Sequence, residues 1–170
     1  PFYLHLTYNA PHTPLQAPEE DLAVFRDRDD LSEAVKILYA MIRRLDRNVG
    51  RLLESVEQLG LRENTLIVFS SDNGPQFGGS GDDCLDRFNC QLHGSKGSTY
   101  EGGIRVPMIF WSKKLEHSKA KGRIVDKITP TTDIAATLLG LAQNKEVVNF
   151  PFDGVNLWPY LVKDEPIPDD

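Results

Sequence analysis

The residues between 65 and 107 include most of the side chains in this sequence that can do chemistry. A hydrophobic segment, residues 65–71, predicts a buried strand and is followed at once by Asp72 and Asn73. Carboxylate and amide oxygens are hard donors for a divalent cation, and open α/β sheets bind ligands beyond the carboxyl ends of their strands. The glycine-rich loop that follows adds the imidazole of His93 and the ammonium of Lys96. This combination indicates a metal-assisted site for an anionic ester.

These signals also have simpler interpretations. Asp72, Asn73 and Gly74 in succession are typical of a tight turn that ends a strand. Lys96 between glycines and serines is also typical of a solvated lysine, and His93 is close enough in sequence to share its pocket. Two side-chain oxygens are too few for calcium, which takes about six to eight. A metal site at Asp72 and Asn73 therefore needs further donors.

A third candidate, His12, lies on a proline-rich loop directly after a predicted strand. Prolines at 11, 14 and 18 exclude regular structure there and stiffen the loop. His12 is then either a general acid or anion-binding donor, or a side chain packed against Pro11 and Pro14. The acidic pairs at 29–30 and 82–83 lie in polar stretches and are more typical of a solvated surface.

Strands alternate with helices in the pattern that must position these residues. Residues 2–8, 65–71 and 106–112 predict strands, and residues 134–139 predict a helix that Gly140 ends. The clearest helix begins after an N-cap at Ser32 and stops at Gly60. Its apolar residues recur every three or four positions: Val35, Leu38, Ile42, Leu45, Val49, Leu52, Val56 and Leu59. We expect an α/β fold with a mixed, largely parallel sheet flanked by helices.

Composition limits the partners. The 170 residues are 40% hydrophobic and carry a net charge of −6, which argues against a general nucleic-acid or membrane-surface binder. No apolar run approaches the roughly 18 residues that a membrane span needs. Cys84 and Cys90 either close a small disulfide ring or remain thiols.

Taken together and in this order, the motifs resemble the sulfatase family of the alkaline phosphatase superfamily. The matching segments are residues 1–4, 10–14, 71–74 and 94–107, of which residues 96–107 are the most specific part; residues 130–140 and 153–157 fit the same pattern. The similarity covers nearly the whole chain. It implies an alkaline-phosphatase-like sandwich and an arylsulfatase-like sulfuric ester hydrolase acting on aryl or carbohydrate sulfates.

The resemblance also implies residue roles. Asp72 and Asn73 match a pair of ligands to the divalent cation, usually calcium. Lys96 matches the lysine that contacts the sulfate and helps the leaving oxygen depart, and His12 matches a histidine that also touches the sulfate. A cation and positive side chains would neutralise the transferring group.

The sequence departs from the family pattern in one respect. Sulfatases carry a formylglycine nucleophile in a Cys- or Ser-x-Pro/Ala-x-Arg motif, and neither Cys84 nor Cys90 begins such a motif. The first pair of acidic metal ligands has no counterpart either. We therefore expect residues 1–162 to be the C-terminal portion of a sulfatase catalytic domain, truncated at the N-terminus and inactive alone, and residues 163–170 to be a polar tail or linker.

The sequence is also compatible with two other functions. A phosphodiesterase or phosphonate hydrolase of the same superfamily would share the metal geometry. A non-catalytic domain that binds a sulfated glycan or a protein partner would keep the fold without the chemistry.

Overall fold

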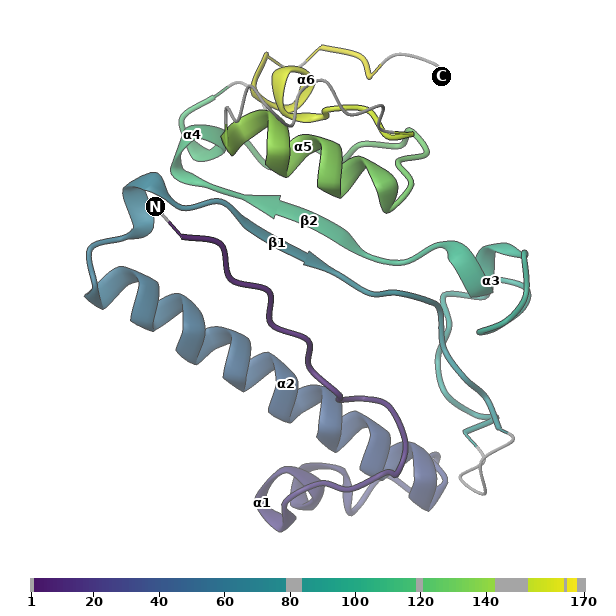
Figure 1. Ribbon diagram of the computed structural model, residues 1–170. Helices are drawn as coiled ribbons and strands as arrows, with labels where there is room; N and C mark the ends of the chain where they lie inside the picture. The colour runs from purple at the N-terminus through teal and green to yellow at the C-terminus, as the bar shows by residue number, and fades with distance from the viewer. Residues whose placement is uncertain (1, 79–83, 119–120, 143–152, 164, 168–170) are drawn as a thin grey trace. The chain divides into compact units, whose positions relative to one another are not determined.

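The chain divides into two compact units in a computed structural model (Figure 1). One unit contains residues 1–60 and 73–107, and the other contains residues 61–72 and 108–170. The structure describes residues 2–78, 84–118, 121–142, 153–163 and 165–167. The acidic pair at 82–83 and half of the predicted tail, residues 164 and 168–170, lie outside the described residues.

The first unit is built on the long helix α2 (Glu33–Gln58). Its predicted limits are confirmed: the Ser32 hydroxyl accepts the Val35 N–H at 3.4 Å, and Gly60 takes a φ of +68° just beyond the end. Val35 and Leu38 of the predicted apolar face form the core together with Cys84. The second half of that face is less covered, and Leu59 is 71% exposed.

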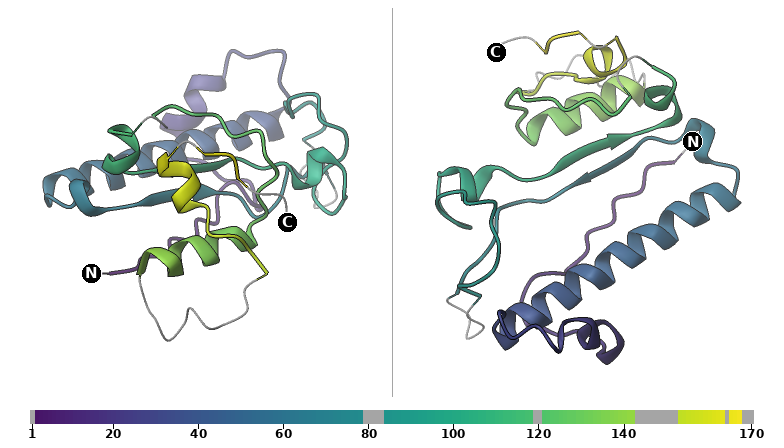
Figure 2. Two further views of the ribbon diagram at one scale, coloured as in Figure 1. Left: turned by 90° about the horizontal axis from the view of Figure 1, so that it is seen from above. Right: turned by 180° about the vertical axis from the view of Figure 1, so that it is seen from behind.

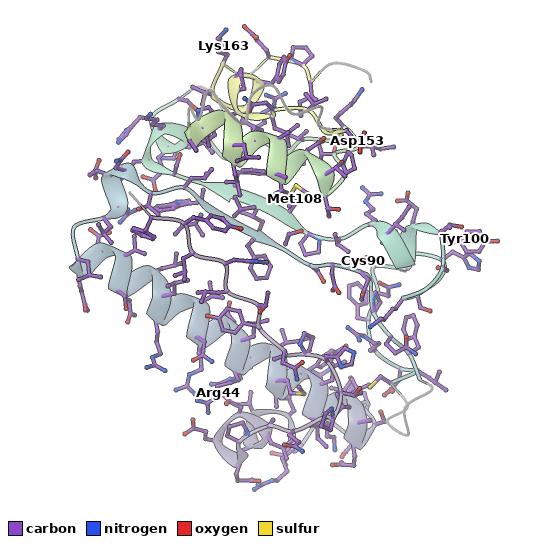
Figure 3. All side chains as sticks on the ribbon, viewed as in Figure 1. Arg44, Cys90, Tyr100, Met108, Asp153 and Lys163 are labelled. Carbon is purple, nitrogen blue, oxygen red and sulfur yellow. The ribbon has the colours of Figure 1, made fainter. Side chains whose placement is uncertain are left out.

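The short helix α1 (Glu19–Leu22) was not predicted from the sequence, and a buried carboxylate connects it to α2. Asp21 is fully buried and accepts hydrogen bonds from Arg43 and Arg44 at 2.5 Å and from Arg47 at 3.2 Å (Arg44 is labelled in Figure 3). Burial alone would raise the pKa of Asp21, but these three guanidinium groups outweigh it and hold the pKa below its ordinary value. α1 continues into a 3₁₀ turn, Ala23–Phe25.

The second unit contains the strands β1 (Ile67–Ser70) and β2 (Met108–Trp111), side by side in both views of Figure 2. They confirm the strands predicted at 65–71 and 106–112, and pair antiparallel, with Ile67 opposite Trp111. The predicted parallel arrangement is therefore wrong for this pair. A parallel pair needs a crossover connection, whereas the loop after β1 returns the chain to run back beside it.

Residues 2–8, predicted as a strand, are extended but form no ladder with any described residue. A strand is defined by backbone pairing, and apolar alternation cannot show whether a partner is present. Phe2, Tyr3 and Leu4 are accordingly more than half exposed.

The remaining helices of the second unit are α4 (Lys113–Glu116), α5 (Thr132–Ala142) and α6 (Trp158–Lys163), preceded by a 3₁₀ turn, Arg62–Asn64. α5 confirms the predicted helix, but Gly140 lies inside it instead of ending it. A side chain at Gly140 would overlap that of Asn156, so close packing explains this glycine. No helix in the described part of the chain is long and apolar enough to cross a bilayer.

Glu116 of α4 is the centre of a polar cluster in the second unit. Its carboxylate accepts hydrogen bonds from Lys113 at 2.8 Å, Trp111 at 3.0 Å and Arg62 at 3.2 Å. The Arg62 guanidinium also lies over the Trp111 ring, 5.2 Å from its centroid. The bond from Lys113 is the main cause that lowers the pKa of Glu116 to about 2, against the opposing effect of burial.

We expect the Glu116 cluster to make stability pH-dependent in acid. Because the folded pKa lies below the ordinary 4.5, the stabilisation is complete above pH 4.5 and is lost as the pH falls toward 2. Glu116→Gln should therefore lower the urea midpoint at pH 7, and its difference from the unsubstituted chain should shrink by pH 3. Glu63→Gln, at an exposed position, is the matched control. A difference that stays constant with pH would contradict this assignment.

Candidate functional site

The segment after β1 begins with the two predicted metal ligands. Asp72 is exposed, and no described residue donates a hydrogen bond to its carboxylate or forms an ion pair with it. Asn73 is half-buried, and its Nδ2 donates to the Gly74 carbonyl at 2.9 Å, which orients the amide. Both positions thus keep the oxygen chemistry that a divalent cation prefers.

Within the first unit, two backbone hydrogen bonds join residues 74 and 75 to the loop of Lys96. The Gly74 N–H donates to the Gly103 carbonyl at 2.9 Å, and the Lys96 N–H donates to the Pro75 carbonyl at 2.8 Å. The predicted site residues Asn73 and Lys96 therefore belong to neighbouring segments, although 22 positions separate them in sequence.

Lys96 lies at the tip of a tight turn. The Ser98 N–H donates to the Ser95 carbonyl at 2.9 Å and the Ser98 hydroxyl donates to the same oxygen at 2.8 Å. Gly97 occupies the third position with a φ of +87°, which type II turns require and glycine adopts without strain. The Lys96 side chain is consequently exposed and has no hydrogen-bond partner among the described residues.

Two buried glycines of the short helix α3 (Glu101–Ile104) let the Lys96 turn lie against that helix. A side chain at Gly103 would overlap the Ser98 carbonyl and lie 2.6 Å from the Ser95 carbonyl. One at Gly102 would overlap the Gly94 carbonyl. Because Gly102 and Gly103 have no side chains, the Lys96 turn can pack directly against the backbone of α3.

Gly103→Ala is expected to lower the free energy of unfolding by roughly 1–3 kcal/mol, because the added methyl group displaces the turn that carries Lys96. Gly50→Ala is the matched control, since it lies within α2 with no atom within 4 Å of the added carbon. That change should instead raise the free energy of unfolding by about 0.5–1 kcal/mol. Urea unfolding measures both. Equal effects of the two substitutions would contradict the packing argument.

The two candidate histidines lie in different surroundings. His12 is exposed, and its Nδ1 lies 2.8 Å from the Thr13 carbonyl; among the described residues no hydrogen bond joins it to Lys96 or Asn73. The His93 ring makes an edge-on contact with Tyr100, with centroids 4.4 Å apart, and not with Lys96 (Figure 3 labels Tyr100 beside α3). Cys84 and Cys90 are not joined by a disulfide; Cys84 is buried and Cys90 exposed.

Sequence inspection missed two residues of this loop. The Asn89 Nδ2 donates to the Leu92 carbonyl at 3.2 Å, so Asn89 helps to shape the turn before Lys96. Arg87 has a half-buried guanidinium that donates to the Gln76 carbonyl at 3.3 Å. In the structure Asn89 comes just before two residues of positive φ, Cys90 and Gln91. In the sequence the turn preference of asparagine was a usable signal for Asn89, and for Arg87 there was none.

The described residues fit a divalent cation only in part. Asp72 and Asn73 have the right donor atoms, but no group of three or more His, Cys, Asp or Glu side chains that could hold a metal occurs in the described part of the chain. A shallow hollow of about 380 Å³ lies at Phe25, Tyr39, Ile42, Arg43 and Asp46, and none of the predicted site residues lines it.

The family profile described as Sulfatase matches residues 1–144. The chain is 34% identical to "Uncharacterized sulfatase YdeN" of Escherichia coli over 95% of its own length and 27% of that relative's. It is 32% identical to mouse "Arylsulfatase J", over 93% of the chain and 25% of that protein. The chain thus spans about a quarter of these relatives.

The solved structure of Ps i-CgsB in complex with k-i-k-neocarrahexaose is also similar. It superposes with a TM-score of 0.76 at 39% identity, over 93% of this chain and 33% of that one. The described fold is thus part of the alkaline-phosphatase-like fold of sulfatases. On the family match and these similarities, the chain belongs to the sulfatase family.

Proposed function

We propose that the full-length protein hydrolyses sulfate esters, with this chain providing part of the metal and sulfate site. The observation that carries the proposal is the pair of backbone hydrogen bonds from Gly74 to Gly103 and from Lys96 to Pro75. They hold residues 73–75, which include the amide of Asn73, beside the turn that carries the exposed Lys96. An anionic ester needs both a cation to bind its oxygens and a donor for its leaving group.

Each residue has a specific role in this proposal. Asp72 and Asn73 would bind a divalent cation, calcium by family resemblance, through carboxylate and amide oxygens. Calcium supplies positive charge that offsets the charge on the sulfate oxygens. Lys96 would hold the sulfate and donate a proton to the departing oxygen, and His12 would add a second hydrogen bond to the sulfate.

The nucleophile is expected to come from a part of the protein beyond these 170 residues. Family resemblance implies formylglycine, and the sequence contains no motif for it. We also propose a sulfated carbohydrate as the substrate. The similarity to Ps i-CgsB, whose structure holds k-i-k-neocarrahexaose, supports this choice.

The test is an assay of the full-length protein on an aryl sulfate, a sulfated oligosaccharide and a phosphate diester, with and without calcium. Calcium-dependent release of sulfate is the expected result. A prevailing diesterase activity would favour the phosphodiesterase alternative. Binding of the sulfated oligosaccharide without turnover of any ester would favour a non-catalytic glycan-binding protein.

A further inference from the structure

Arg87 carries a positive charge that no residue in the described part of the chain neutralises. Its guanidinium is half-buried, and its Nε is fully covered without a hydrogen-bond partner. Its Nη1 donates at 3.3 Å to the Gln76 carbonyl, which carries no net charge. Cations removed from water are ordinarily paired, because burial penalises an uncompensated charge.

The acidic neighbour of Arg87 is occupied elsewhere. The Asp86 carboxylate accepts the Ser32 N–H at 2.7 Å and the Ser32 hydroxyl at 2.8 Å, at the N-terminus of α2. The titratable groups that act on Arg87 are the Cys84 thiol and the Tyr39 hydroxyl, both ordinarily neutral at pH 7. Burial lowers the pKa of Arg87, as expected for a cation with no anion beside it, and the guanidinium remains charged.

The backbone around Arg87 is held on both sides, so the side chain is pre-positioned. The Phe88 N–H donates to the Tyr39 hydroxyl of α2 at 2.9 Å, and the Cys84 N–H donates to the Phe77 carbonyl at 2.7 Å. The Arg87 N–H closes the turn on the Cys84 carbonyl at 3.2 Å. A binding group fixed before the ligand arrives loses little conformational entropy on binding.

Arg87 and the turn of Lys96 are bonded to adjacent residues. The Arg87 guanidinium donates to the Gln76 carbonyl, and the Lys96 backbone N–H donates to the carbonyl of the preceding residue, Pro75. The arginine side chain and the backbone that carries Lys96 are thus both bonded to residues 75–76. Arginine binds planar or tetrahedral anions through paired N–H groups, which lysine cannot do.

We propose that Arg87 binds a second anionic group of the substrate, a sulfate or a carboxylate on a sugar next to the one that is hydrolysed. This inference rests on the proposed function. It makes Arg87 a specificity residue: it contributes to binding of a multiply charged glycan but not to cleavage of a small aryl sulfate. Whether the second group is a sulfate or a carboxylate is decided by comparing oligosaccharides that carry one or the other.

The test compares Arg87→Ala with Arg51→Ala, a change at an exposed arginine of α2, in the full-length protein. Substrates are an aryl sulfate, a disulfated disaccharide and a monosulfated disaccharide with a uronate. For one of the two disaccharides, Arg87→Ala should raise KM about 10- to 100-fold with kcat unchanged, the effect of losing one charged hydrogen bond. Arg87→Lys should restore part of that loss, and the aryl sulfate should be hydrolysed as before.

Three outcomes would overturn the proposal. They are an unchanged KM for every substrate, equal losses for the aryl sulfate and the disaccharides, and a lower melting temperature with loss of all activity. The last would mean that Arg87 pairs with an acidic group of the protein itself. If no sulfate ester is hydrolysed, the shift in melting temperature caused by each disaccharide still tests Arg87, separately from the proposed function. A shift that Arg87→Ala leaves unchanged would then overturn it.

Discussion

Replacing Lys96 with alanine in the full-length protein is expected to lower kcat for sulfate-ester hydrolysis by about 100- to 1,000-fold. The ammonium would stabilise charge that develops on the sulfate and the leaving oxygen, so its loss acts on the transition state more than on binding. The effect should be largest for substrates with a basic leaving oxygen, because these need the proton most. Steady-state kinetics with aryl sulfates of graded leaving-group pKa measures this dependence.

The structure separates this catalytic effect from an effect on folding. The Lys96 backbone N–H holds the turn through the Pro75 carbonyl, and alanine keeps that bond. The side chain is exposed and has no hydrogen-bond partner among the described residues, so stability should change by less than about 0.5 kcal/mol. Lys114→Ala, at an exposed lysine of α4, is the control and should leave kcat unchanged. A loss of activity that tracks a lower melting temperature would contradict the catalytic role.

Local signals in the sequence were sufficient to predict the elements whose start and stop residues are recognisable. The periodicity of α2, the hydroxyl of Ser32 at its start and the glycine after its end all agreed, and the structure confirms those limits. β1 and β2 were found from short apolar runs. Their antiparallel pairing was missed because direction depends on how the long loop returns, a non-local property that no short pattern encodes.

The sequence analysis missed residues whose role depends on their neighbours in the folded chain. In the sequence, Asp21 is one of several acidic residues in a polar stretch. Only the structure shows that it is buried and bound to three arginines of α2. Gly140 was interpreted as a helix stop, whereas its actual constraint is the Asn156 side chain. The proximity of Asn73 and Lys96 depends on hydrogen bonds between backbone groups of distant segments, which side-chain patterns do not show. For His12 the family resemblance remains the support, and its role stays a prediction.

The second large effect is expected at Asp72. Asp72→Ala in the full-length protein should weaken calcium binding by at least about 100-fold, because calcium affinity depends strongly on the number of charged oxygen ligands. Activity at low calcium should fall accordingly, and excess calcium should restore part of it. Asn73→Ala should have a smaller effect, since an amide oxygen carries no formal charge. Isothermal titration calorimetry with calcium measures both.

Asp29→Ala provides the matched control for Asp72, because Asp29 is exposed and belongs to the acidic pair at 29–30. Its neighbour Asp30 is bound to Arg28, whose hydrogen bond lowers the pKa of Asp30 to about 2, as expected of a surface ion pair. In the isolated chain calcium binding should be weak, because its described residues hold no group of three metal-binding side chains. Tight binding by the isolated chain that Asp72→Ala abolishes would mean that these residues already complete a cation site, and that the sulfatase centre is not divided as proposed.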